Sequence, residues 1–342
     1  MSCRTASTGF AARKPAPESP PDGGRPPGIS PRCRTDFGEP FRTGTDPRED
    51  GAMTTDAITL LWNRQSIWSQ ASDRLKVRIS RARVLVLSLT VTGAVAGAAS
   101  AAVAQSAGRF CAAVAALALA LAAVAARGAA PGNVRDWTRA RSVSEALKSE
   151  VFGYLAGVGR FGGADRDEVV LRALAELSAS AGDLVRHTTG LAPRTRPLPA
   201  VDDVDSYAAV RVRGQLDHYY RPKARLMAVR VRTARQCEIG LSAAAAGLAA
   251  VVAVFPGIAV SAWIGVLTTI TTAITAHVGA ARYAYQQVEF TRTADELERL
   301  LVNRTTGLTT DDDFVADAER VISIQNEGWM AKLGSDERPA KQ

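Results

Sequence analysis

The chain has 342 residues, of which 46% are hydrophobic, and its mean hydropathy of −0.02 resembles that of a soluble protein. That average is misleading, because the apolar residues are concentrated in uncharged segments. The net charge of +8 raises the question of nucleic-acid binding, but no recognised nucleic-acid-binding motif accompanies the basic residues. We therefore expect no nucleic-acid partner.

The uncharged segments predict membrane spans. Residues 84–108 and 110–126 are separated only by Arg109, and residues 239–281 carry no charge, with Pro256-Gly257 near their middle. One helical span needs about 20 apolar residues. We predict an all-α integral membrane protein with four transmembrane helices in two parallel hairpins, plus cytoplasmic helices. The alternative is a large soluble bundle with buried helices, because Ala-rich helices insert into membranes less readily than Leu-rich ones.

Basic residues flank both predicted hairpins, whereas the connections within the hairpins carry only Arg109. By the positive-inside rule, we expect both termini and the central region to lie in the cytoplasm. Basic residues beside a bilayer also attract anionic headgroups, so the lipid bilayer is the predicted partner. The residues that we assign to this membrane surface are Arg78, Arg81, Arg83, Arg230, Arg232 and Arg235.

Outside the spans the chain alternates between polar helices and breaks. Residues 1–52 are rich in Pro, Gly and Arg and are expected to be disordered, as are residues 336–342. Trp62 and Trp68 suit either a membrane interface or packing between helices. Apolar periodicity predicts helices over 57–83, 134–158, 165–185, 202–236 with a bend at Pro222, 282–304 and 314–333.

The entries to the two hairpins resemble each other. Residues 77–83 and 229–235 agree in character at five positions, and each is followed by two spans and a polar helix. This pattern indicates an internal duplication. The alternative is that basic residues flank any span. An even number of spans returns the chain to the same side, so the two copies should be parallel.

Several short segments are similar to the SLATT family of bacterial two-span proteins. They are Leu61-Trp62-Asn63-Arg64-Gln65, Trp68-Ser69, Leu75-Lys76, Ser80-Arg81-Ala82-Arg83, His218-Tyr219-Tyr220-Arg221-Pro222-Lys223-Ala224, Glu319-Arg320-Val321-Ile322-Ser323 and Glu327-Gly328-Trp329. The resemblance covers roughly residues 57–333. It implies two tandem two-span units, at 53–190 and 202–335, joined by a linker at 191–201.

The SLATT resemblance also implies a function. Such proteins are expected to act as oligomeric membrane effectors in bacterial conflict and defence, permeabilising the membrane once activated. This chain contains no nucleotide-synthesising or nucleotide-sensing domain, so the trigger is expected to come from an upstream signalling protein. A different function is a membrane-anchored helical scaffold that recruits cytoplasmic partners without conducting ions.

Small residues in the spans are candidates for close helix packing. Gly93 and Gly97 share a face of the first span, and Ala243 and Gly247 share a face of the third. In lipid, small residues let helix backbones approach closely. The same faces suit contacts inside a hairpin or between subunits.

The fourth span carries a row of hydroxyl groups from Thr268, Thr271, Thr272 and Thr275, with His277 beyond them. These residues suit either a hydrated path through an oligomer or helix packing, with each threonine bonded to its own backbone. His277 suits a pH sensor or a residue at the membrane interface.

Ionisable groups elsewhere point to no enzyme, cofactor or metal site. Glu238 lies at the start of the third span and is expected to pair locally with Arg235, three residues earlier. The three histidines are dispersed, and no catalytic grouping or glycine-rich phosphate loop occurs. Residues 311–313 are three aspartates, which suit a helix N-terminus better than a cation site.

Overall fold

The computed structural model describes residues 49–103, 105–255 and 261–335, which form helices and turns without any strand. Most of the predicted N-terminal tail at 1–52, all of the C-terminal tail at 336–342 and the Pro256-Gly257 break lie outside these residues. All the helices described belong to one compact unit. In chain order they are α1 (Glu49–Ala102), α2 (Gln105–Ala126), α3 (Pro131–Ala156), α4 (Arg166–Ser180), α5 (Val204–Tyr207), α6 (Arg221–Val254), α7 (Ser261–Ala281), α8 (Tyr283–Thr305) and α9 (Asp311–Ser335).

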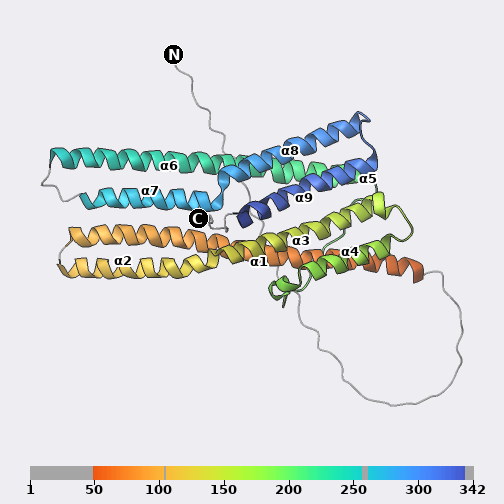
Figure 1. The fold of residues 1–342 in the computed structure, drawn as a ribbon, viewed down its shortest axis with the longest axis horizontal. Helices are drawn as coiled ribbons and strands as arrows, with labels where there is room; N and C mark the ends of the chain where they lie inside the picture. Colours follow the sequence, from red (N-terminus) through yellow and green to blue (C-terminus); the bar gives the residue numbers. More distant parts are fainter. Residues whose placement is uncertain (1–48, 104, 256–260, 336–342) are drawn as a thin grey trace, which may run out of the picture. The chain divides into compact units, whose positions relative to one another are not determined.

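Two helical hairpins carry the apolar segments. One is formed by α1 and α2 and the other by α6 and α7, and Figure 1 shows both hairpin tips at the same end. Four helical stretches are long and apolar enough to cross a membrane. The predicted fold class, four spans in two parallel hairpins with further helices at one end, is therefore confirmed.

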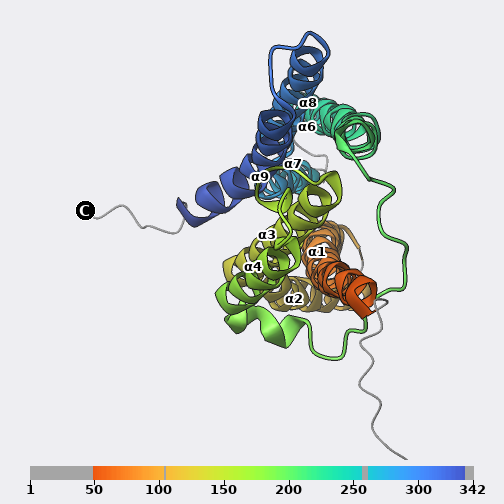
Figure 2. The same cartoon turned by 90° about the vertical axis from the view of Figure 1, so that its right-hand side faces the viewer.

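The four spans lie in a single row. Helix α1 contacts α2 on one side and α7 on the other, and α7 also contacts α6. The order across the row is therefore α2, α1, α7 and α6, as Figures 1 and 2 show. The most apolar window of each span is at most 17% buried within the chain. A single row leaves both faces of every span open, which suits a lipid environment.

Each hairpin combines an unbroken helix with an interrupted one. Helix α1 runs for 54 residues, roughly 80 Å, through the predicted membrane boundary. Between α2 and α3 the chain passes through a 3₁₀ turn at Arg127–Ala129, and Pro131 then opens α3. Between α7 and α8, Arg282 adopts φ = 52°, a left-handed conformation that is uncommon for a residue with a side chain. Both interruptions lie at the polar ends of the spans.

The polar helices pack around two apolar clusters. The first joins α1, α3 and α4 through side chains such as Leu61, Leu147 and Val170. The second contains Tyr207 and Phe314 from the C-terminal half, but it also contains Phe152 of α3. The ring of Phe152 meets that of Tyr207 edge-on, with centroids 6.2 Å apart. The two halves of the chain therefore share a core.

Two predicted helices differ from those observed. The helix expected over 165–185 ends at Ser180 and gives way to a 3₁₀ segment, Gly182–His187. The helix expected over 202–236 is π-helical at Ala208–Arg213 and Leu216–Tyr220, directly before Pro222. Proline lacks an N–H and crowds the preceding turn, which a wider winding there accommodates; the bend expected at Pro222 stays a prediction.

The two tryptophans of α1 pack between helices. Trp62 and Trp68 are 8% and 5% exposed, and both belong to the first apolar cluster. The indole Nε1 of Trp62 donates to the carbonyl of Pro197 at 3.0 Å, and the guanidinium of Arg196 stacks over its ring at 3.4 Å. Of the two interpretations that the sequence allowed, the structure shows helix packing.

The small-residue faces of the two hairpins have different surroundings. A Cβ atom at Gly93 would lie 3.0 Å from the side chain of Leu119, and one at Gly97 would lie 3.9 Å from Ala115. This face therefore packs inside the α1–α2 hairpin. A Cβ atom at Gly247 meets nothing within 4 Å, and Ala243 is exposed. The corresponding face of α6 is open.

We predict that Gly93→Leu weakens the first hairpin, because the added side chain overlaps Leu119 and overpacking costs about 1–3 kcal/mol. Gly247→Leu is the matched control, since it adds the same side chain to an open face. The thermal midpoint of the detergent-purified protein should fall for Gly93→Leu and change much less for Gly247→Leu. Equal midpoints would contradict the observed packing.

Candidate functional site

The threonines of α7 point in two directions. Thr268 and Thr272 line a cavity of about 840 Å³ between α7 and α1, together with His277. Thr271 and Thr275 do not line it. The hydroxyls of Thr268, Thr271 and Thr272 each donate to the carbonyl four residues earlier at 2.9 Å, and Oγ1 of Thr275 lies 3.1 Å from the carbonyl oxygen of Thr271. The structure therefore divides the predicted row, and it shows the backbone bonding that the packing interpretation expected.

Thr275 makes a polar contact between the spans of the second hairpin. Its hydroxyl donates to Oε1 of Glu238 on α6 at 2.7 Å. Among the described residues no ion pair joins Glu238 to Arg235, so the expected local pair is not observed. The contact between Thr275 and Glu238 ties α6 to α7.

The cavity between α1 and α7 is apolar apart from its threonines and its end. Val86 and Leu87 of α1 face Ile264 and Ala273 of α7 across it. At the polar end of the spans, Arg83 and His277 complete the wall. The cavity therefore lies between the first hairpin and α7 of the second.

The basic residues assigned to the membrane surface also fall into two groups. Arg83 and Arg230 line cavities between the hairpins. No cavity described includes the other four, although Arg230 is exposed, as they are. These four are Arg78, Arg81, Arg232 and Arg235.

A buried ion pair lies where the two halves meet, and sequence reasoning missed it. Arg211, 1% exposed, donates from Nε and Nη2 to the two carboxylate oxygens of Glu319, each at 2.8 Å. The hydroxyl of Tyr207 donates to Glu319 at 2.9 Å, and the guanidinium of Arg211 lies over the ring of Phe152. The π-helical segment, α9 and α3 thus converge on one carboxylate.

The environment of Glu319 holds it in its charged form. Burial alone would raise its pKa, but the charge and hydrogen bonds of Arg211, with the hydroxyls of Tyr207 and Ser149, lower the pKa below its usual value of 4.5. Within the described residues, Nη1 of Arg211 has no hydrogen-bond partner. Each of the two buried charges therefore depends on the other for its compensation.

The sequence did carry a signal for this pair. Glu319 falls on the apolar face of its helix, four residues after Val315 and three before Ile322, both buried. Arg211 likewise lies between the buried Ala208 and Val212. A charged residue on an apolar face predicts a buried partner, although it cannot say which residue that partner is.

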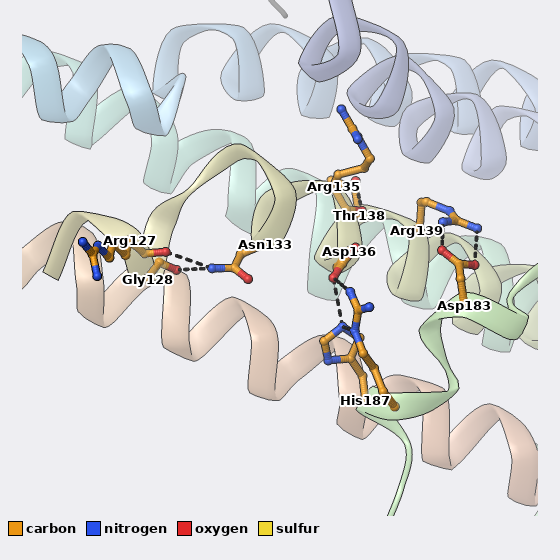
Figure 3. Close-up of polar contacts among 10 residues, drawn as sticks. Arg127, Gly128, Asn133, Arg135, Asp136, Thr138, Arg139, Asp183 and His187 are labelled. Carbon is orange, nitrogen blue, oxygen red and sulfur yellow. Dashed lines mark hydrogen bonds and ion pairs between the residues drawn. The ribbon is translucent and has the colours of Figure 1, made fainter. Parts of the chain in front are cut away.

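A second polar network joins α3 to the segment after α4 (Figure 3). Asp136 accepts from Arg186 Nη2 at 2.6 Å and lies 3.0 Å from Nε2 of His187. Burial would raise the pKa of Asp136, but the hydrogen bonds from His187 and Arg186 outweigh it and hold that pKa below its usual range. Nearby, Arg139 forms a two-point ion pair with Asp183. These contacts hold the 3₁₀ segment against α3.

The aspartates at 311–313 lie in the first turn of α9 and make local or interhelical hydrogen bonds there. The backbone N–H of Asp313 donates to the hydroxyl of Thr310 at 3.2 Å, which is a helix cap. Asp311 accepts from Arg304, and Asp312 accepts from the backbone of Gly159. Among the described residues, no group of three or more His, Cys, Asp and Glu side chains is arranged to hold a metal ion.

The fold and these contacts define a multi-span α-helical membrane protein. Residues 207–329 match the family described as SMODS and SLOG-associating 2TM effector domain 1 (SLATT_1). Residues 66–168 match a family described as a protein of unknown function (DUF4231). No curated protein and no solved structure matches the chain significantly.

The match over residues 207–329 supports the SLATT resemblance for the second half of the chain and points to a two-transmembrane domain of effector type. The first half matches a different family model. Two tandem SLATT units are therefore not shown, and the internal duplication stays a prediction.

We predict that Glu319→Gln lowers the free energy of unfolding by about 3–5 kcal/mol, because it leaves Arg211 buried without a counter-charge. The double variant Arg211→Met/Glu319→Leu replaces both charges with apolar groups and should recover most of that loss. Denaturation in detergent, followed by circular dichroism, measures both. A double variant as unstable as the single one would argue against a coupled pair.

Acid should also weaken the protein through Glu319. A carboxyl whose pKa is lowered on folding stabilises the fold fully above its unfolded pKa, near 4.5, and the stabilisation is lost as the pH falls through the folded pKa. The thermal midpoint of the wild type should therefore drop below pH 4.5. In Glu319→Gln this part of the drop should be missing.

Proposed function

We propose that this chain is a multi-pass effector of the bacterial inner membrane, which assembles into an oligomer and permeabilises the bilayer when triggered. The observation that carries the proposal is the single row of four spans, whose most apolar windows are 0–17% buried within the chain. A lone row encloses no path across the membrane. Several rows side by side can enclose one.

The edge of the row offers a surface for assembly. On α6 the small residues Ala243 and Gly247 face open space, whereas the equivalent residues of α1 are covered by α2. Small residues favour close contact between helices in lipid. A second copy of the chain, packed on this face of α6, would continue the row.

The family match supports the effector role. The family is described as a two-transmembrane effector domain, and the match covers α6 and α7 together with α8 and most of α9. The proposal assigns no catalytic step and no cofactor to the chain. Activation comes from an upstream signalling protein that acts on the polar helices.

The charge pattern supports the orientation. Exposed arginines lie on α1 and α6 just before the spans begin, and the hairpin tips carry little charge. By the positive-inside rule, the polar helices and both termini face the cytoplasm. The signal therefore arrives on the side where α3, α8 and α9 lie.

We predict that the purified protein, once activated by its upstream signalling protein, releases a trapped dye from vesicles of phosphatidylethanolamine and phosphatidylglycerol. If the α7 hydroxyls line the path, Thr268→Val/Thr271→Val/Thr275→Val should reduce release several-fold. Thr92→Val, which removes an exposed hydroxyl of α1, is the control and should leave release unchanged. Release that survives the triple change would show that the threonines only pack.

The alternative is a membrane-anchored scaffold. Chemical cross-linking before the release assay separates the two functions. An oligomer that is demonstrated by cross-linking but releases no dye would overturn permeabilisation in favour of the scaffold.

A further inference from the structure

A second cavity lies at the polar end of the spans, between the two halves of the chain. Its volume is about 800 Å³, and α1, α3, α6 and α8 contribute to its wall. The wall contains no Asp or Glu side chain. It contains five cationic residues, Lys76, Arg83, Arg141, Lys223 and Arg230.

Aromatic rings and a phenol hold these cations in place. Nη2 of Arg141 donates to the hydroxyl of Tyr219 at 2.7 Å, and Nζ of Lys223 lies 5.9 Å from the centre of the same ring. The guanidinium of Arg230 lies over Tyr283 at 5.3 Å. Aromatic faces attract cations without neutralising them. The wall itself therefore holds no counter-charge. The carboxylates of Glu145 and Asp73 act on Arg141 and Lys76 from outside it.

The cations are close enough to repel one another. Burial lowers the pKa of the Lys76 ammonium, and the charges of three neighbouring cations lower it further. These neighbours are Arg141, Lys223 and Arg230. Asp73 acts in the opposite direction. A cluster of like charges that costs free energy when empty is relieved by an anion.

This basic cavity adjoins the apolar cavity between α1 and α7. Arg83 and His277 belong to the walls of both. Arg83 directly precedes the uncharged segment of α1, so the basic cavity lies at the level of the headgroups and the apolar cavity lies within the hydrocarbon. The two spaces together have one strongly cationic compartment and one apolar compartment.

We propose that an anionic phospholipid binds between the two hairpins, with its phosphate in the basic cavity and an acyl chain in the apolar cavity. A water-soluble phosphate would satisfy the cations but leave the apolar compartment unexplained. The lipid contacts α1 and α3 from the first half and α6 and α7 from the second, so it joins the two halves. The inference rests on the membrane location in the proposed function and does not require permeabilisation.

Native mass spectrometry of the detergent-purified full chain tests this assignment. The wild type should retain phosphatidylglycerol in preference to phosphatidylcholine. Lys76→Gln/Arg230→Gln removes two cations of the cavity and should weaken retention at least about tenfold. The matched control, Arg78→Gln/Arg232→Gln, removes two cations of the same two helices that line neither cavity, and should retain the lipid.

Thermal stability gives a second measurement that detects misfolding. Without lipid, Lys76→Gln/Arg230→Gln should melt no lower than the wild type, because repulsion has been removed. Added phosphatidylglycerol should raise the midpoint of the wild type and of the control, but raise that of the cavity variant much less. Equal lipid retention and equal stabilisation in the cavity and control variants would overturn the proposal.

Two further experiments distinguish a bound lipid from a bound soluble phosphate. Ala273→Phe fills part of the apolar cavity and should weaken binding of long-chain phosphatidylglycerol while sparing a short-chain form. Inorganic pyrophosphate should compete only weakly. Strong protection by pyrophosphate, with no difference between chain lengths, would reject the lipid and assign the cavity to a soluble anion. All these experiments measure lipid binding or thermal stability of the protein in detergent, where no flux across a membrane occurs. Their results are therefore independent of the dye-release assay.

Discussion

Within hydrocarbon, a polar group without a partner costs several kcal/mol, and this constraint shapes the membrane part of the chain. It explains why the spans are helices and why the observed interruptions, at Arg127–Ala129 and Arg282, lie at their polar ends. It also explains why the α7 threonines bond to carbonyls of their own helix. Glu238, the acidic group nearest the apolar segment of α6, finds its partner on the facing span.

The membrane part of the fold was largely predictable, because its signals are local. Uncharged runs, flanking arginines and an even number of spans define two parallel hairpins without any knowledge of tertiary contacts. The close approach at Gly93 also followed from residue size. The open face at Gly247 did not, since the same small residues occur whether or not a neighbour covers them.

Contacts between distant segments were not predictable from one sequence. Arg211 and Glu319 are 108 positions apart, and His187 meets Asp136 across 51. A charged residue on an apolar face indicates that a buried partner exists, but only the fold identifies that partner. The basic cavity was likewise not predictable from the sequence. Of its five cations only Arg83 and Arg230 were assigned to the membrane surface, and the convergence of all five from three helices depends on how the halves dock.

The unbroken course of α1 has a mechanical consequence. Helix kinks arise at identifiable features such as proline or a disrupted turn, and α1 has no proline between Glu49 and Ala102. Its polar half and its span therefore form one continuous helix that is expected to move as a rigid unit. In contrast, α7 and α8 are separated by a break in the helix at Arg282. A partner that displaces the polar end of α1 should therefore change the tilt of its span. The neighbouring spans α2 and α7 can adjust to that tilt at the breaks at Arg127–Ala129 and Arg282.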